Sequence, residues 1–211
     1  MSALKAYDCY LVSVAREPDP SRKTELLAQI VEYLLDKPLA TVTFRTLAHA
    51  LGVSTFTLVY HFGSRAELLS EIVGAISGRE NDIQAQLSAE PPSLDAYFSG
   101  LEQSWQWSIQ PRNRQLQRLE FEAAMMEAVD PGPRSYTRAL YERWQAIGRD
   151  ALLALGCSEA DAEAESRLTV SAMFGLQYDL IVNEDVEAAT AAFRAMLDGH
   201  RRHLESLVRQ G

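Results

Sequence analysis

The sequence has little cysteine and no apolar segment long enough to span a membrane. Its two cysteines, Cys9 and Cys157, match no metal-binding or disulfide pattern, so we expect free thiols in a reducing compartment. No apolar run approaches the roughly 20 residues that cross a bilayer. The N-terminus does not look like a signal peptide, because Asp8 interrupts its short apolar stretch and no small-residue cleavage site follows. These absences predict a cytoplasmic location.

The sequence also lacks the excess of basic residues that is typical of nucleic-acid binders. Its net charge is −9, from 20 Lys and Arg against 29 Asp and Glu. Residues 21–70 differ from the rest: they hold five basic and four acidic side chains, and the remainder holds 15 basic and 25 acidic ones. The basic residues of this window are Arg22, Lys23, Lys37, Arg45 and Arg65. Because an acidic remainder repels DNA, contact with nucleic acid would be limited to this window.

Sustained alternation of polar and apolar residues, the pattern of a β-strand, is absent as well. Apolar residues recur at intervals of three and four, which predicts an all-α fold of about nine helices. Gly and Pro lie mostly between the periodic segments and mark their ends. Helices are predicted after Asp19, Thr43, Ser54 and Ser64, then over 94–109, 116–126, 140–155 and 158–182, and from 186 to near the C-terminus.

The most informative stretch covers residues 43–69, TFRTLAHALGVSTFTLVYHFGSRAELL. Two short helical segments flank a tight turn at Gly52, the arrangement of a DNA-reading helix-turn-helix. Gly52 suits a positive φ at the end of the first helix, and Ala48 lets the two helices cross closely. The small core beneath them is predicted to contain Leu47, Val53, Leu58 and Phe62.

The second of these helices directs the rest of its side chains outward. Hydroxyl and imidazole groups can bond phosphates or base edges, and methyl groups of Thr and Val can meet thymine methyls. The helix N-terminus adds backbone N–H groups that suit phosphate, and Arg45 on the preceding helix can reach a phosphate or a guanine. The candidate DNA-binding residues are Thr43, Arg45, Ser54, Thr55, Phe56, Thr57, Val59, Tyr60 and His61.

This stretch resembles the DNA-binding domain of the TetR family of bacterial repressors. The shared residues are Thr43, Leu47-Ala48, Gly52-Val53-Ser54, Thr57-Leu58, Tyr60-His61-Phe62, Ser64-Arg65 and Leu68-Leu69. The resemblance covers roughly residues 21–70 and implies that Arg65 binds phosphate, where the family commonly has Lys. Two residues of the reading face depart from the pattern: Val59 replaces the usual Tyr, and Phe56 replaces a small residue.

Beyond residue 70 the resemblance rests on length and on the run of helices. It implies that the last two helices pair with those of a second subunit; an internal helix pair in a monomer is the alternative. The small and apolar residues of these helices are Leu168, Ser171, Ala172, Gly175 and Val182, then Ala189, Ala192, Phe193, Met196, Leu197, Leu204 and Leu207. We therefore divide the chain into an N-terminal extension (1–20), a helix-turn-helix DNA-binding domain (21–70) and a ligand-binding and dimerisation domain (71–211).

The extension and the larger domain each leave a question open. Leu4, Tyr7, Leu11 and Val14 have the spacing of a short amphipathic helix, although a mobile tail fits residues 1–20 equally well. In the larger domain, aromatic and Met side chains beside polar ones such as Glu120 predict a cavity for a small, largely apolar ligand. The candidate lining residues are Trp105, Trp107, Phe121, Met125, Trp144, Phe174 and Tyr178. Trp105 and Trp107 are two residues apart and cannot face the same way.

No motif for catalysis or cofactor binding is found. The sequence shows no Gly-rich phosphate loop, nucleophile–base pair or metal-spaced ligand set, and His200 and His203 fit a solvated helix end better than a metal site. We expect no cofactor and no enzyme activity. The main prediction is a homodimeric repressor that a small-molecule effector releases from its double-stranded DNA operator. The alternatives are a helical ligand-binding or adaptor protein that no longer reads DNA, and an enzyme acting on a hydrophobic substrate.

Overall fold

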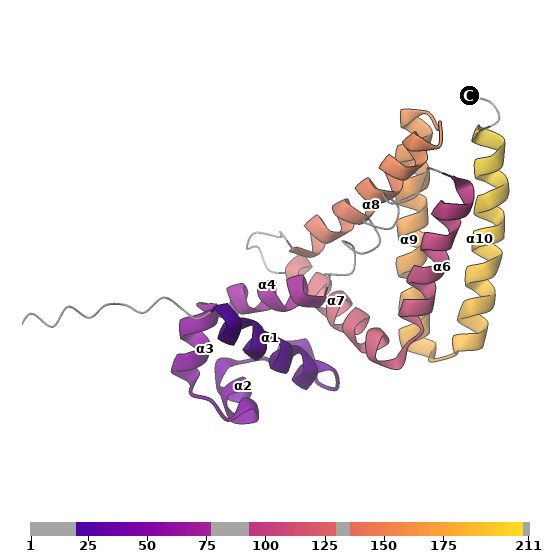
Figure 1. Cartoon of the computed structure of the whole chain (residues 1–211). Helices are drawn as coiled ribbons and strands as arrows, with labels where there is room; N and C mark the ends of the chain where they lie inside the picture. The colour runs from indigo at the N-terminus through magenta and orange to yellow at the C-terminus, as the bar shows by residue number, and fades with distance from the viewer. Residues whose placement is uncertain (1–19, 77–92, 130–135, 209–211) are drawn as a thin grey trace, which may run out of the picture.

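The computed structural model describes residues 20–76, 93–129 and 136–208, which form nine α-helices and one short 3-10 turn (Figure 1). The all-α fold and the expected number of helices are confirmed over these residues. The elements are α1 (Pro20–Leu34), η1 (Leu39–Thr41), α2 (Phe44–Leu51), α3 (Thr55–Phe62), α4 (Arg65–Ile76), α6 (Leu94–Ser108), α7 (Pro111–Val129), α8 (Tyr136–Ala154), α9 (Glu159–Asn183) and α10 (Val186–Val208). The helix considered for the first 20 residues lies outside the described residues.

Short-range capping determines where many of these helices begin. Thr43, Ser54, Ser93 and Ser158 each have extended backbone and accept a hydrogen bond from the N–H three residues on. Such caps satisfy N–H groups that would otherwise have no partner in the first turn. Pro111 is the first residue of α7, a position where its missing N–H costs nothing. The predicted break there is therefore also a helix start.

Helices α1 to α4, which we call the head, enclose one apolar core. Its largest fully buried side chains are Leu26, Ile30, Leu34, Leu39, Leu47, Leu58, Leu68 and Ile72. The core does not end at the head, because Leu116, Leu119 and Ala123 of α7 belong to the same cluster. In Figure 1, α7 extends from beside α4 to the lower ends of α6 and α9.

Helices α6 to α10, which we call the body, enclose a second core. Figure 1 shows α6, α9 and α10 running alongside one another, and α8 packs against α9. The buried residues that hold them together include Phe98, Trp105, Leu152, Leu180, Phe193 and Leu204. Within the described ranges, no helix has the length and apolar character needed to cross a membrane.

Candidate DNA-binding face and ligand cavity

The turn between α2 and α3 is built from local hydrogen bonds. Thr43 and Thr46 cap α2 reciprocally, each side chain accepting from the other's backbone N–H. Ser54 accepts from the N–H of Thr57 at 2.9 Å, and the two hydroxyl oxygens lie 2.8 Å apart. Between these caps, Gly52 has φ +66°, which a residue without Cβ adopts at little cost. The two helices are thus held at a defined angle by residues from a single short segment.

Helix α3 is buried along one face and presents the other to the solvent. Leu58 and Phe62 are buried in the head core, which anchors the helix. On the other side, Phe56 is 76% exposed, Val59 46% and Tyr60 42%. Thr55 is also exposed, whereas Thr57 and His61 are half-buried. Every residue predicted to face outward on this helix therefore has some access to solvent, and Phe56 and Val59 have the most among the apolar ones.

The basic residues of the head are not equivalent. Three of the five form ion pairs with acidic neighbours: Arg22 with Glu25, Lys23 with Glu71, and Lys37 with Asp36. Arg45 and Arg65 form no ion pair within the described residues, and both are exposed. These two arginines flank α3 in the sequence, one on α2 and one at the start of α4. They are the charges left to meet a phosphate.

Arg65 and its neighbours also connect α4 to the cap of α2. The Nε of Arg65 donates to the carbonyl oxygen of Val42 at 2.9 Å. Next to it, Ser64 and Glu67 form the predicted capping box, with the Ser64 N–H donating to Glu67 Oε2 at 2.6 Å. Hydrogen bonds from the backbone and hydroxyl of Ser64 lower the pKa of Glu67. The hydrogen bond from the Arg65 side chain to Val42 therefore fixes the position of Arg65 on the head.

Two side chains of α7 clamp the end of α1 and the turn that follows it, which no local pattern in the sequence indicated. Arg118 donates to the carbonyl oxygens of Leu34, Leu35 and Lys37 at 2.9, 3.3 and 3.2 Å. These carbonyls lie at or just beyond the C-terminus of α1, where the helix leaves acceptors unsatisfied. Arg118 is also paired with Glu122, which accepts from the N–H of Leu39 at 2.5 Å. We call Arg118 and Glu122 the α7 clamp.

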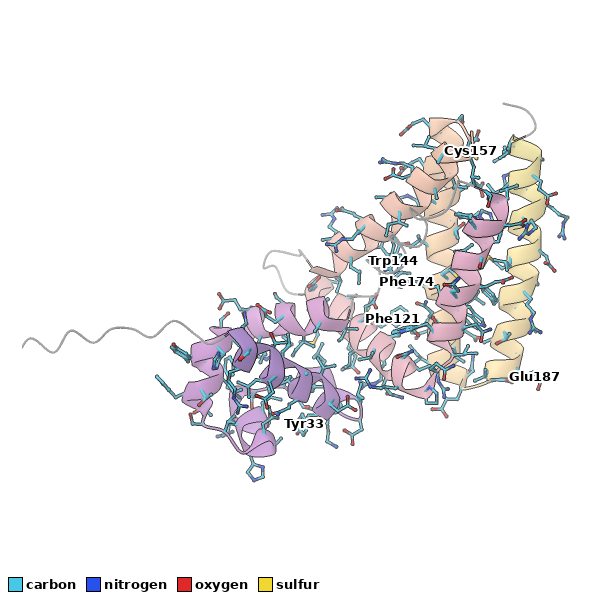
Figure 2. All side chains as sticks on the ribbon, viewed as in Figure 1. Tyr33, Phe121, Trp144, Cys157, Phe174 and Glu187 are labelled. Carbon is cyan, nitrogen blue, oxygen red and sulfur yellow. The ribbon has the colours of Figure 1, made fainter. Side chains whose placement is uncertain are left out.

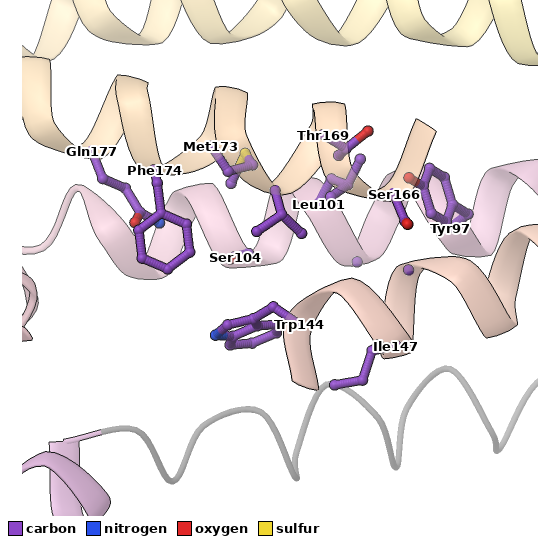
Figure 3. Close-up of a pocket in the computed structure, with 13 residues that line it drawn as sticks. Tyr97, Leu101, Ser104, Trp144, Ile147, Ser166, Thr169, Met173, Phe174 and Gln177 are labelled. Carbon is purple, nitrogen blue, oxygen red and sulfur yellow. The ribbon is translucent and has the colours of Figure 1, made fainter. Parts of the chain in front are cut away.

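An apolar cavity lies between α6, α8 and α9 (Figure 3). Its empty volume of about 670 Å³ includes space open to the solvent. Leu101, Trp144, Ile147, Val170, Met173 and Phe174 form most of its wall. Most of the polar residues lie toward its ends: Gln177 at the end beside Phe174, and Thr169, Ser166 and Tyr97 at the other, with Ser104 between them (Figure 3). The arrangement suits an apolar ligand with polar groups at its extremities.

A second cavity lies between α7, α8 and α9, and Phe174 lines both. Its wall contains Glu120, Phe121, Met125, Thr137, Arg138 and Tyr141. The rings of Phe121 and Phe174 meet edge to face, with centroids 5.9 Å apart. Figure 2 shows Phe121, Trp144 and Phe174 together in the middle of the body. Of the seven candidate ligand residues, Trp144 and Phe174 line the first cavity, and Phe121, Met125 and Phe174 the second.

The other three candidates line neither cavity, which corrects our lining set. Trp105 is fully buried, stacks on Phe193 at 4.9 Å and donates its indole N–H to Thr190. Trp107, which faces the other way as expected, packs against the core of the head. Tyr178 is 59% exposed on α9. Helix α6 is covered on both sides, so Trp105 packs in the body core and Trp107 packs against the head core.

Each end of the first cavity backs onto a buried hydrogen-bond network. At one end, the Ser108 hydroxyl oxygen accepts from Gln177 at 3.1 Å and from Gln117 at 2.8 Å. At the other, His200 Nε2 lies 3.1 Å from the Tyr97 hydroxyl and 3.0 Å from the Thr169 hydroxyl. Three of these four contacts join residues 31 or more positions apart, and Ser108 and Gln117 are nine apart. No local pattern in the sequence could have indicated them.

His200 corrects the prediction of a solvated helix end for this histidine. It is buried, and its Nδ1 lies 3.4 Å from Glu165, whose other oxygen lies 3.1 Å from exposed His203. Burial lowers the pKa of His200 and raises that of Tyr97 to about 12. In the part of the chain that the structure describes, no group of three or more acidic, His or Cys side chains is arranged to hold a metal.

The outer faces of α9 and α10 are rich in small and apolar residues. On α9, the exposed stripe consists of Leu168, Ser171, Gly175, Tyr178 and Val182, at alternating spacings of three and four. On α10 the exposed small residues are Ala188, Ala191, Ala192 and Ala195. Our expectation for α10 is corrected in part, because Ala189, Phe193, Leu197 and Leu204 are buried within their own subunit. The body core uses these residues, so a partner could contact only the opposite face.

Comparison with known proteins points to one family and one fold. Residues 26–72 match the family model described as bacterial regulatory proteins, tetR family. None of the curated proteins matches the chain. A TetR transcriptional regulator from Legionella pneumophila is 15% identical with a TM-score of 0.60, covering 90% of this chain and 97% of its own.

Two further solved structures share the fold. NalD, the secondary repressor of the MexAB-OprM multidrug efflux pump in Pseudomonas aeruginosa, is 17% identical with a TM-score of 0.62 over 85% of this chain and 95% of its own. A TetR variant from Acinetobacter baumannii AYE in complex with minocycline is 18% identical with a TM-score of 0.52 over 88% and 97%. At these identities the likeness concerns the fold, which extends over head and body together.

Proposed function

This chain belongs to the tetR family of bacterial regulatory proteins, and we propose that it is a homodimeric, cytoplasmic repressor that a small, largely apolar ligand releases from its operator. Residues 21–70 act as the DNA-binding domain and residues 71–211 bind the ligand and the second subunit. The observation that carries the proposal is the capped, exposed helix α3 between two arginines that no acidic side chain in the described residues neutralises.

The head is proposed to insert α3 into the major groove. Ser54 caps the helix N-terminus, which points N–H groups and a partial positive charge at a phosphate. Arg45 and Arg65 bind the backbone on either side, and Thr43, Thr55, Thr57, Tyr60 and His61 supply further polar contacts. The acidic remainder of the chain keeps the body away from DNA. Phe56 and Val59 lie on the solvent-exposed face of α3 and enlarge the surface that it offers to DNA. Their departure from the family pattern therefore does not favour a head that no longer reads DNA.

The subunits are proposed to pair through the outer faces of α9 and α10. Leu168, Tyr178 and Val182 are each more than half exposed in the single chain, and burying them would release ordered water. Apart from its chain neighbours and the nearby backbone of its own helix, a Cβ added at Gly175 or Gly199 would meet no atom of the described residues within 4 Å. Small residues at these positions allow helices of a second copy to approach closely. A dimer also places two reading heads at successive major grooves.

The effector is proposed to occupy the cavity between α6, α8 and α9. Trp144, Met173 and Phe174 would supply apolar contact, and Gln177 and Thr169 polar anchors. The signal has a short path to the head: Phe174 contacts Phe121 of α7, and the next residue, Glu122, belongs to the α7 clamp. Helix α4, which packs on α7, would move with it. The coupling needed is about 1–3 kcal/mol.

The proposal is tested in two stages. Bound duplexes are selected from random DNA, and affinity for the enriched site is measured by fluorescence anisotropy. Small apolar compounds that raise the melting temperature are then added to the complex. We expect such a compound to weaken DNA binding, and Phe174→Ala to abolish that response, whereas Val129→Ala, at an exposed position of α7, leaves it intact. Failure to enrich any sequence would refute DNA binding; stabilisation without loss of affinity would refute the coupling alone.

A further inference from the structure

The recognition helix α3 lacks the side chains that most often identify bases. Its sequence, TFTLVYHF, contains no Lys, Arg, Asp, Glu, Asn or Gln. Those are the residues that make paired hydrogen bonds to guanine or adenine, or accept one from cytosine, in the major groove. The hydroxyl of Thr57 already lies 2.8 Å from the hydroxyl of Ser54. Direct reading by this helix must therefore depend on something other than bidentate hydrogen bonds.

The exposed side chains of α3 form an apolar ridge. Phe56, Val59 and Tyr60 lie at positions i, i+3 and i+4, which places them on one face of the helix. Their exposed fractions are 76%, 46% and 42%. The rings of Phe56 and Tyr60 are near-parallel, with centroids 6.4 Å apart and planes at 20°. The ridge exists in the single chain, so contact with DNA would require little further ordering of these side chains.

We propose that Phe56 and Val59 read thymine through its C5 methyl group, so that the half-site of the operator is defined by thymines at the contacted positions. The inference rests on the proposed DNA-binding function and specifies what α3 recognises. The thymine methyl is the apolar group that the major groove presents, and aliphatic and phenyl side chains are its usual contacts. Phe56 is the second residue of α3, near the helix end that meets base edges in helix-turn-helix complexes.

The surroundings of the ridge favour DNA over a protein partner as its occupant. The α3 N-terminus lies at one end of it, and Arg45 and Arg65 carry positive charge on the helices before and after it. Neither arginine is neutralised by an ion pair within the described residues, although the other three basic side chains of the head are. An apolar strip with cationic groups beside it matches a groove lined by methyls and bordered by phosphates.

The test removes methyl groups from the DNA without changing its base pairing. Duplexes are first selected from a random library with the full-length protein, and each thymine of the enriched half-site is then replaced in turn by deoxyuridine. We expect one or two positions per half-site at which affinity falls by about fourfold, the effect of one buried methyl-sized group. Deoxyuridine in the flanking DNA should have no effect.

Protein variants then assign the contact. At the thymine that Phe56 contacts, Phe56→Ala should bind the thymine and deoxyuridine duplexes equally, whereas Phe56→Leu, which keeps an apolar side chain, should still prefer thymine. Val129→Ala, a matched loss of an exposed apolar side chain in the body, should behave as the wild type. Enriched sites without thymine, or undiminished affinity for every deoxyuridine duplex, would overturn the inference while leaving DNA binding established. Absence of any enriched sequence would overturn the DNA-binding function and this inference with it.

Discussion

The head and the body differ in how far apart along the chain their hydrogen-bonded residues lie. In the head, the pairs Thr43–Thr46, Ser54–Thr57 and Ser64–Glu67 are each three residues apart. In the body, Ser108 bonds to Gln177 across 69 residues, Trp105 to Thr190 across 85, and Tyr97 to His200 across 103. The caps and the turn of the head are locally specified, although Lys23–Glu71 and Arg65–Val42 join residues 48 and 23 positions apart. The body depends on the docking of distant helices. A ligand that shifts those helices can thus act on the body and leave the head intact.

Helix α7 contacts both regions and therefore connects the locally capped head to the helices of the body. Leu116, Leu119 and Ala123 complete the head core, and Phe121 touches the cavity residue Phe174. The α7 clamp then ties the helix to the end of α1. A rigid head moved as one piece by α7 would change the position of α3 without changing its shape.

The largest effect is expected from the outer face of the body. Gly175→Trp places a bulky side chain on the α9 stripe, and we expect monomers and a loss of operator affinity of roughly 10²-fold, since joining two heads raises avidity by that order. Light scattering and anisotropy measure both. Gly175→Ala is the matched control and should remain dimeric, because its Cβ adds little bulk. A wild type that is monomeric at micromolar concentration would contradict the dimer.

The next largest effect is expected at the α7 clamp. Arg118→Ala removes donors from three carbonyls and leaves Glu122 without its cation, so we expect unfolding free energy to fall by about 2–3 kcal/mol, in the range of charged hydrogen bonds. Urea unfolding measures it, and hydrogen exchange should rise at the end of α1. Arg112→Ala breaks an exposed pair with Glu32 and should cost less than about 1 kcal/mol. Equal costs would show that the clamp has no special role.

A smaller effect is expected at the head surface. Arg65→Gln should lower the slope of log affinity against log salt by about one unit, because one phosphate contact is lost. Arg65→Lys should retain the slope. Lys37→Gln, at a residue already paired with Asp36, should behave as the wild type. If Arg65→Gln leaves the slope unchanged, its guanidinium serves only to hold Val42 and the cap of α2.

The smallest effect concerns pH and the body core. Burial lowers the pKa of His200 below its ordinary value of 6.5, so the unfolded chain binds a proton more readily than the folded one. Stability from this group is complete above pH 6.5 and is lost as the pH falls toward the lower folded pKa. The free energy of unfolding, measured between pH 8 and 5, should decline gradually once the pH falls below about 6.5. His200→Gln should flatten this decline, and exposed His49→Gln should not; an unaltered slope in His200→Gln would refute the assignment.

Much of the head could be predicted because its signals are local. The caps at Thr43, Ser54 and Ser64, and the turn at Gly52, each depend on residues within four positions. The outward positions on α3 follow from the helical period once Leu58 and Phe62 are assigned to the core. Arg65 was identified by resemblance, but its hydrogen bond to Val42 spans 23 residues and was not foreseen. The α7 clamp was missed for the same reason.

The cavity could be predicted only in outline. Aromatic content indicated that α6 to α9 enclose apolar space, and Trp144 and Phe174 do line it. The sequence could not distinguish a cavity wall from a core, since both are apolar at helical spacing. Trp105 belongs to the core because Phe193 of α10 stacks on it, and Thr190 meets its indole N–H. Which face of α10 remained for a partner depended on the same packing.

The sequence by itself determined the run of helices, the helix starts that Thr43, Ser54 and Ser64 cap, and the family, because hydrophobic period and capping act within a few residues. It did not determine every end, since α7 and α8 begin five and four residues before the predicted positions. Tertiary structure alone decided which aromatic side chains face a cavity, that His200 is buried, and that α7 grips the head. Those outcomes depend on contacts between segments many residues apart, such as Arg118 with the end of α1 and Tyr97 with His200. Such contacts form only when helices dock, and a local pattern contains no information on which distant face a side chain will meet.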